Sequence, residues 1–148
     1  MKGYNGLIMA GLMGLCLPAY ADITYFSCET GKGTVALKEA NGVLHYTMTK
    51  NGKEAFSFAS NGQDFAGFTY NHYARYQTDY LNVSFSNGGY RYLVFSNEEG
   101  NEERRGVTVI NLKNSKDYTY ECTSAAVDRL NELSEKLTCD IDSAQGCE

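Results

Sequence analysis

Short β-forming runs separated by tight-turn sequences constrain this chain more than any other feature. Asn-Gly steps begin at residues 41, 51, 61 and 87, between stretches rich in Val, Ile, Thr, Phe and Tyr. Both residues of such a step tolerate the positive φ that tight hairpin turns require. The single proline, Pro18, precedes all of these runs and interrupts none of them. We predict nine strands, over residues 23–28, 34–40, 42–50, 55–60, 68–76, 80–86, 90–96, 106–113 and 117–122.

Within these runs, apolar and polar residues alternate. In residues 42–50, Leu44, Tyr46 and Met48 share one face and polar side chains occupy most of the other. This period of two is typical of strands that bury one face. We therefore expect a mostly β fold, an antiparallel β-barrel or β-sandwich of about eight or nine strands.

The pattern changes after the last predicted strand. Val127, Leu130, Leu133 and Leu137 follow one another at intervals of three or four residues, and charged residues lie between them. This spacing forms one apolar stripe on a helix. We predict one C-terminal amphipathic helix over residues 124–137, with Ser124 as its N-cap, packed on the sheet or closing one end of a barrel.

The N-terminus has the organisation of a secretory signal peptide. Lys2 precedes an apolar run over residues 7–17, and Ala19-Tyr20-Ala21 has the small-x-small pattern of a cleavage site. The run is shorter than the roughly twenty residues that span a bilayer, so we expect no membrane insertion. We predict a signal peptide over residues 1–21, a single β-rich domain over residues 22–148, and a periplasmic location. Acylation at Cys16 is the alternative, although Leu15 stands where a lipoprotein signal has a small residue.

Four cysteines follow the predicted cleavage site: Cys28, Cys122, Cys139 and Cys147. An even number in an exported chain indicates two disulfides, for which three pairings exist. We predict Cys28–Cys122, which would join the first and last strands of one sheet, and Cys139–Cys147, which would close the polar tail. Zinc binding is the alternative, but these spacings do not match a zinc knuckle.

Groups that usually carry catalysis are sparse in this sequence. His45 and His72 are the only histidines, and no Gly-x-Ser-x-Gly string occurs. We predict no catalytic residues, no metal and no cofactor; an enzyme whose site is invisible in linear spacing is a minor alternative. The formal net charge of −5, which becomes more negative when Lys2 is removed, disfavours nucleic acid and favours a basic partner.

Tyrosine is unusually frequent, with twelve residues and no tryptophan. Tyrosine and arginine are common anchors at protein interfaces. In the tyrosine-rich stretch over residues 65–80, we select Tyr73, Arg75 and Tyr76 as candidate partner-binding residues. Core packing is the alternative, since strand alternation would send Tyr76 inward with Phe68 and Tyr70.

A cluster of acidic residues lies between two predicted strands. Its bland interpretation is a solvated hairpin tip, and its functional interpretation is an acidic protrusion that enters a basic cleft. The candidate partner-binding residues of this cluster are Glu98, Glu99, Glu102 and Glu103.

Two families of small periplasmic proteins of Gram-negative bacteria resemble parts of this chain. The segment from Tyr25 to Gly31, together with Cys122, resembles the C-type lysozyme inhibitors of the membrane-bound and periplasmic class. Residues 87–96 and 106–113, followed by Cys122, look like immunity proteins of type VI secretion systems. The first resemblance implies an eight-stranded barrel with a disulfide between its ends, and the second a β-rich, cysteine-bridged and often dimeric protein.

Export, two disulfides and the absence of a catalytic set favour a binding role. We expect a periplasmic immunity protein that blocks the active cleft of a basic, secreted peptidoglycan hydrolase, and a homodimer is compatible with this role. The alternatives are an inhibitor of host lysozyme and a periplasmic barrel that holds a small ligand in a cavity lined by Phe and Tyr.

Overall fold

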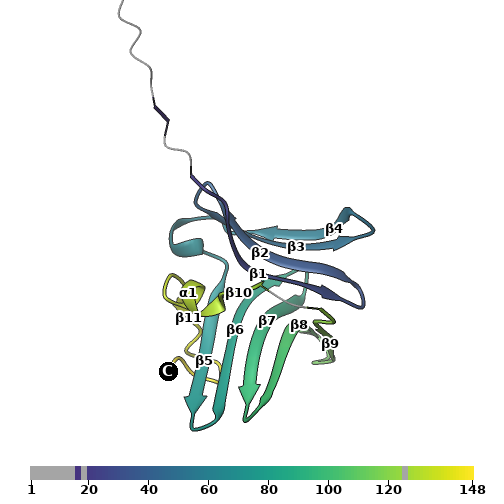
Figure 1. The fold of residues 1–148 in the computed structure, drawn as a ribbon, viewed down its shortest axis with the longest axis vertical. Coiled ribbons are helices and arrows are strands. Elements are labelled where there is room, and N and C mark those ends of the chain that lie inside the picture. The colour runs from purple at the N-terminus through teal and green to yellow at the C-terminus, as the bar shows by residue number, and fades with distance from the viewer. Residues whose placement is uncertain (1–15, 18–19, 125–126) are drawn as a thin grey trace, which may run out of the picture.

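The protein is a β-sandwich of two sheets that do not close into a barrel (Figure 1). The structure, a computed structural model, describes residues 16–17, 20–124 and 127–148. Most of the predicted signal peptide, residues 1–15 and 18–19, lies outside the described residues, so that segment stays a prediction. Within the described ranges, no helix is both long enough and apolar enough to cross a membrane.

The described residues contain eleven strands. Sheet A has the order β10-β1-β2-β3-β4, and sheet B has the order β11-β5-β6-β7-β8-β9. All neighbours are antiparallel except β11, which lies parallel to β5. Sheet A consists of β1 (Ile23–Thr30), β2 (Gly33–Ala40), β3 (Val43–Lys50), β4 (Lys53–Ala59) and β10 (Val127–Asp128). Sheet B consists of β5 (Thr69–Arg75), β6 (Thr78–Asn87), β7 (Tyr90–Glu99), β8 (Glu102–Asn111), β9 (Asp117–Glu121) and β11 (Thr138–Cys139).

All nine predicted strands are present as β1 to β9, but one predicted turn is wrong. Asn41 and Asn51 adopt positive φ, each with its following glycine, at the β2–β3 and β3–β4 hairpins. Asn61-Gly62 instead begins the crossing from sheet A to sheet B, which contains the 3-10 turn η1 (Gln63–Phe65). Phe65 and Phe68 are both buried there. Their burial draws this loop onto the core, so it does not return as a hairpin.

Aromatic side chains fill the space between the two sheets. The ring of Phe85 on β6 lies 4.4 Å from that of Phe58, 4.8 Å from that of Tyr92 and 5.0 Å from that of Tyr46, measured between centroids. Tyr46 is 1% exposed, and burial raises the pKa of its hydroxyl far above the ordinary value. This packed layer holds sheet B against sheet A and leaves the far ends of the β5–β8 strands beyond it (Figure 1).

The predicted helix over residues 124–137 is wrong in its extent. The observed helix α1 spans only Leu130–Ser134, and residues 125–126 lie outside the described part of the chain. Val127 and Asp128 instead pair with the free edge of β1, and the Arg129 amide donates to the Tyr25 carbonyl at 2.7 Å. Strand pairing therefore replaces the first helical turns. Leu130, Leu133 and Leu137 are buried as the stripe predicts, whereas Val127 is 44% exposed.

Both predicted disulfides are present. Cys28–Cys122 has a Cα–Cα distance of 5.6 Å and Cys139–Cys147 has one of 6.0 Å, within the usual range for a disulfide. The expectation that the long bridge joins two strands of one sheet is wrong. Cys28 lies on β1 of sheet A, and Cys122 follows β9 of sheet B. The bridge therefore links the two layers of the sandwich.

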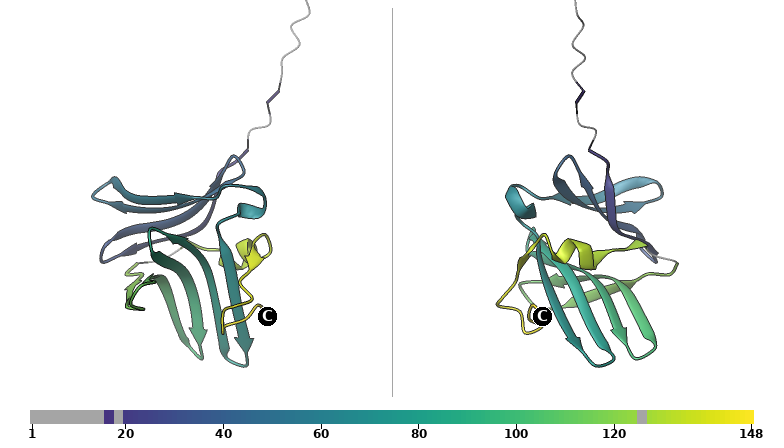
Figure 2. Two further views of the ribbon diagram at one scale, coloured as in Figure 1. Left: turned by 180° about the vertical axis from the view of Figure 1, so that it is seen from behind. Right: turned by 60° about the vertical axis from the view of Figure 1, so that its left-hand side comes forward.

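The C-terminal tail passes around β5 onto the outer face of sheet B, the face turned away from sheet A (Figure 2). The amide of Asn71 on β5 donates to the carbonyl oxygens of Asp140 and Gly146, at 2.8 and 3.0 Å. Arg91 on β7 donates to the Asp140 carboxylate at 2.6 Å. These contacts attach the tail to strands β5 and β7 of sheet B.

The ion pair between Arg91 and Asp140 predicts a pH-dependent contribution to stability. The hydrogen bond from Arg91 holds the pKa of Asp140 below its usual value of 3.8. The stabilisation is therefore present above the pKa of the unfolded chain, near pH 4, and is lost as the pH falls through the folded pKa. Because both side chains are partly exposed, we expect Asp140→Asn to cost at most about 1 kcal/mol at pH 7.

Urea denaturation between pH 7 and pH 2 measures this difference. The free energies of unfolding of the wild type and Asp140→Asn should converge toward the acid end of the range. Asp142→Asn is the matched control, since Asp142 is an exposed carboxylate of the same tail. A difference between wild type and Asp140→Asn that persists unchanged at pH 2 would contradict this role of the ion pair.

Candidate functional site

Two hairpin tips of sheet B lie side by side at the end of the molecule that extends beyond sheet A (Figure 1). The β5–β6 tip contains Tyr76 and Gln77, and the β7–β8 tip contains Gly100 and Asn101. The Gly100 amide donates to the Gln77 carbonyl at 2.8 Å. We call these two joined tips, with the strand ends that carry them (residues 73–80 and 97–105), the hairpin end. Both of the segments selected from the sequence therefore meet in one place.

The aromatic and arginine candidates lie on the β5–β6 hairpin. The ring of Tyr73 is stacked with that of Tyr80, with a centroid distance of 6.0 Å, and the Arg75 guanidinium lies 5.0 Å from the Tyr73 centroid. Tyr76 is 89% exposed. The inward direction that alternation implies for Tyr76 is wrong, because β5 ends at Arg75 and Tyr76 belongs to the turn. Tyr76 is the most exposed large hydrophobic side chain of the hairpin end.

The acidic cluster lies at a hairpin tip, but the two strands extend further into it than the predicted limits at residues 96 and 106. β7 continues to Glu99 and β8 begins at Glu102, so only Gly100 and Asn101 form the turn. The ladder pairs Glu98 with Glu103 and Glu99 with Glu102. Strand alternation therefore divides the four glutamates into two pairs, one on each face of sheet B.

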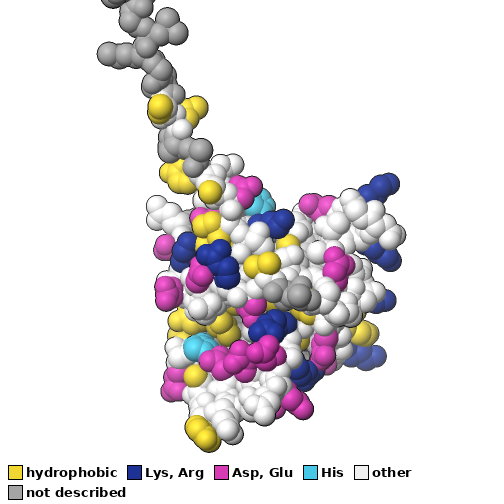
Figure 3. Space-filling model, viewed as in Figure 1, with side chains coloured by type: hydrophobic (Ala, Val, Ile, Leu, Met, Phe, Trp, Pro, Cys, Tyr) yellow, Lys and Arg dark blue, Asp and Glu magenta, His cyan; other side chains and the backbone are white. Residues whose placement is uncertain are grey.

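On the inner face of sheet B, an acidic row crosses three neighbouring strands. Asp79, Glu98 and Glu103 occupy successive register positions on β6, β7 and β8. His72 contacts Asp79 at 3.0 Å, and Arg105 donates to Glu103 at 2.8 Å. Figure 3 shows acidic side chains gathered over the lower half of this face, beside a histidine. The row gives this side of the hairpin end a negative character.

A hollow of about 270 Å³ adjoins the acidic row. Asp128 accepts hydrogen bonds there from Arg105 at 2.7 Å and from Ser96 at 2.5 Å. The hydrogen bond to Asp128, and then that to Glu103, raise the pKa of Arg105. Arg105 is thus compensated by two carboxylates, while the exposed Glu98 has no ion pair among the described residues.

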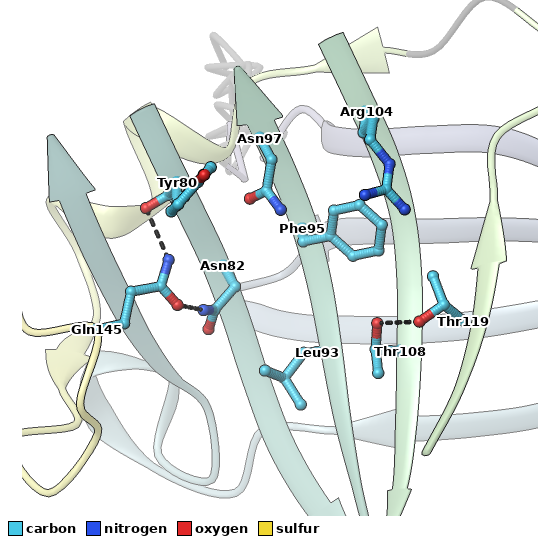
Figure 4. Close-up of a pocket in the computed structure, with 9 residues that line it drawn as sticks. All are labelled: Tyr80, Asn82, Leu93, Phe95, Asn97, Arg104, Thr108, Thr119 and Gln145. Atoms are coloured by element: carbon cyan, nitrogen blue, oxygen red, sulfur yellow. Dashed lines mark hydrogen bonds between the residues drawn. The ribbon is translucent and has the colours of Figure 1, made fainter. Parts of the chain in front are cut away.

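A second hollow, of about 300 Å³, lies on the outer face of sheet B (Figure 4). Glu99 and Glu102 of the hairpin end line a smaller hollow beside it. The two hollows share Tyr80, Asn97 and Arg104. Sequence reasoning missed this hollow. The sequence does show polar residues, such as Asn82, that alternate with the buried apolar residues of β6. However, only the strand register brings them together with polar residues of β7 and β8. Its lining residues are Tyr80, Asn82, Leu93, Phe95, Asn97, Arg104, Thr108, Thr119 and Gln145.

Within the residues that the structure describes, no three His, Cys, Asp or Glu side chains form a group suited to a metal ion. The string Asn82-Val83-Ser84 has the form of a glycosylation acceptor, but Asn82 is 4% exposed and lies within β6. Its burial makes it a poor acceptor in the folded protein.

Comparison with protein-family models, with curated proteins and with solved structures gives no significant match for this chain. The class of protein is therefore defined by its own fold and surface. It is a disulfide-linked β-sandwich with a charged, tyrosine-bearing hairpin end.

Proposed function

We propose that this protein is a periplasmic immunity protein that binds a secreted cell-wall-degrading effector and blocks its active cleft with the hairpin end. The observation that carries the proposal is the Gly100–Gln77 hydrogen bond, which joins the two tips into one protrusion. That protrusion combines the exposed Tyr76 with four glutamates. Because no catalytic residues are assigned to the chain, the proposed action is binding alone.

The chemistry of the hairpin end supports a basic partner. An aromatic anchor surrounded by charged residues is typical of the energetic centre of a protein interface. Carboxylates on both faces of the tips complement a cleft lined by lysine and arginine, and such complementarity speeds and orients association. The antiparallel ladder continues to Glu99 and Glu102. The carboxylates are thus presented on paired strands, which lowers the entropy lost on binding.

Two disulfides are consistent with an oxidising compartment outside the cytoplasm. The predicted signal peptide over residues 1–21 agrees with that location.

An inhibitor of host lysozyme would use the same surface on a different basic enzyme, so the test below includes a lysozyme. Edge strands β4 and β9 are the natural sites for a homodimer.

The aromatic core favours the binding proposal over an interior ligand carrier. The carrier hypothesis needs a cavity lined by Phe and Tyr. Phe56, Phe58, Phe85 and Tyr92 instead stack on one another with small interplanar angles. This packing occupies the space that an apolar ligand would need.

Inhibition assays against purified cell-wall hydrolases test the proposal. The panel contains a C-type lysozyme, a bacterial muramidase, an amidase and an endopeptidase, each measured by clearance of a peptidoglycan suspension. We expect the mature protein to inhibit at least one of them at a 1:1 ratio. Replacing Glu98, Glu99, Glu102 and Glu103 with lysine should weaken binding by about 100-fold, and Tyr76→Ala by about 10-fold or more.

A charge-matched control separates the hairpin end from the overall acidity. Lysine at Glu54, Asp117, Glu135 and Asp142, which are exposed positions elsewhere on the protein, changes the net charge by the same amount. This control should retain inhibition. Equal loss in both quadruple variants, or no inhibition of any enzyme in the panel, would contradict the proposal.

A further inference from the structure

The hollow on the outer face of sheet B has two polar sides and an apolar centre. Figure 4 shows Leu93 and Phe95 between the amides of Asn82 and Gln145 on one side and Arg104, Thr108 and Thr119 on the other. Phe95 is 8% exposed although it lies on the face turned away from the core. The hollow thus offers an apolar floor bordered by hydrogen-bonding groups.

A fixed chain of hydrogen bonds leaves one buried acceptor unused in this hollow. The Gln145 Nε2 donates to the Tyr80 carbonyl at 2.9 Å, which sets the orientation of the Gln145 amide. Its Oε1 then accepts from Asn82 Nδ2 at 2.6 Å, which sets the orientation of the Asn82 amide. The Oδ1 atom of Asn82 has no hydrogen-bond partner among the described residues, although Asn82 is only 4% exposed. This atom has almost no exposed surface, so it is not a contact for a ligand; the hydrogen bonds instead fix the two amides as one wall of the hollow.

The charge of the hollow favours a neutral ligand. Arg104, its only charged lining residue, donates to Glu121 from Nε at 2.9 Å and also from Nη2. Its positive charge is therefore compensated within the protein. Glu99 and Glu102 border the adjoining space and repel anions.

The remaining groups suit a ring that carries many hydroxyl groups. Tyr80 presents aromatic surface for the C–H groups of such a ring, beside the largely buried Phe95. The paired hydroxyls of Thr108 and Thr119, 2.9 Å apart, and the amide of Asn97 both donate and accept hydrogen bonds. A volume of about 300 Å³ lies at the small end of ligand sites, which suits one or two sugar rings. We propose that this hollow is a binding site for a neutral mono- or disaccharide, whose hydroxyl groups form hydrogen bonds with Thr108, Thr119 and Asn97.

The sugar site does not depend on the proposed inhibition of a hydrolase. None of the seven partner-binding candidates lines the hollow, and its ligand is a free saccharide. Failure of one proposal therefore leaves the other standing, and separate assays distinguish them.

NMR titration of the isotope-labelled mature protein tests the site directly. The probes are N,N′-diacetylchitobiose, cellobiose and maltose, with glucuronate as the anionic comparison. We expect saturable shifts of the Asn82 and Gln145 side-chain amide signals with at least one neutral disaccharide, at a Kd of about 1 mM or below. Glucuronate should bind at least about tenfold more weakly. No saturable shift with any neutral disaccharide would overturn the proposal, and equal affinity for glucuronate would overturn the assignment of a neutral ligand.

Two substitutions in the lining of the hollow test the site. Asn82→Leu removes the amide that holds Gln145 in place and should weaken sugar binding by at least about tenfold. Urea denaturation of each variant controls for folding, since a variant that loses binding but unfolds at the wild-type urea concentration has lost the site and not the fold. Tyr80→Ala, which disturbs no buried polar group, should also weaken binding, and equal affinity of Asn82→Leu, Tyr80→Ala and wild type would overturn the site.

Discussion

Replacing Cys28 and Cys122 with alanine is expected to lower the free energy of unfolding by about 4 kcal/mol. This disulfide closes a loop of 94 residues. In the chain-entropy model, opening such a loop raises the conformational entropy of the unfolded chain, which lowers the free energy of unfolding by about 4 to 5 kcal/mol. The bridge also joins sheet A to sheet B, so its loss removes a covalent link between layers that are otherwise held by packing. Urea denaturation of the oxidised wild type and the double variant measures the difference.

The second disulfide provides the matched control for loop length. Cys139 and Cys147 are only 8 residues apart, so the same model predicts that removing their disulfide lowers the free energy of unfolding by about 2 to 3 kcal/mol. We therefore expect the Cys139→Ala/Cys147→Ala variant to be more stable than the Cys28→Ala/Cys122→Ala variant by about 2 kcal/mol. The reverse order would contradict the loop-length argument and would indicate that tail docking contributes more than the inter-sheet link.

Phe85→Ala is expected to cost about 3 to 5 kcal/mol. Phe85 is 3% exposed, and its ring lies within 5.2 Å of those of Phe58, Phe68, Tyr46 and Tyr92, measured between centroids. Truncation leaves a cavity between two sheets whose other rings are held by their own strands, so the cavity cannot collapse fully. Thermal and urea unfolding measure the loss.

Tyr76→Ala is the control for the loss of an aromatic ring. Tyr76 is 89% exposed, so we expect its truncation to change stability by no more than about 0.5 kcal/mol. This result would also show that the binding defect expected of Tyr76→Ala does not come from unfolding. A loss for Phe85→Ala as small as that for Tyr76→Ala would contradict the central place of Phe85 in the core.

The predicted strands succeeded where local chemistry decides the outcome. The Asn41-Gly42 and Asn51-Gly52 steps form hairpins because their positive φ values are a local property of those residues. Asn61-Gly62 has the same composition and does not, because burial of Phe65 and Phe68 directs that segment across to the other sheet. The apolar stripe from Leu130 to Leu137 indicated the buried residues correctly, but the free edge of β1 took Val127 and Asp128 as a strand.

In the candidate site too, some features follow from the local sequence and others depend on tertiary contacts. Selecting Tyr76 and the glutamates required only their residue types, whereas their proximity depends on the hydrogen bond between Gly100 and Gln77. The separation of Glu98 and Glu103 from Glu99 and Glu102 follows from the register of β7 with β8. The outer hollow was invisible beforehand, because Asn82 and Gln145 are 63 residues apart in the chain.

The sequence by itself determined the β class of this protein, the positions of nine strands and the presence of two disulfides. These follow from alternation, turn propensity and cysteine number, which act over a few residues or over the chain as a whole. Only the tertiary structure decided that the sheets form an open sandwich, that the long disulfide links its two layers, and that two tips and a tail create surfaces on sheet B. Those outcomes depend on contacts between segments distant in sequence, where burial and strand pairing outweigh local preference.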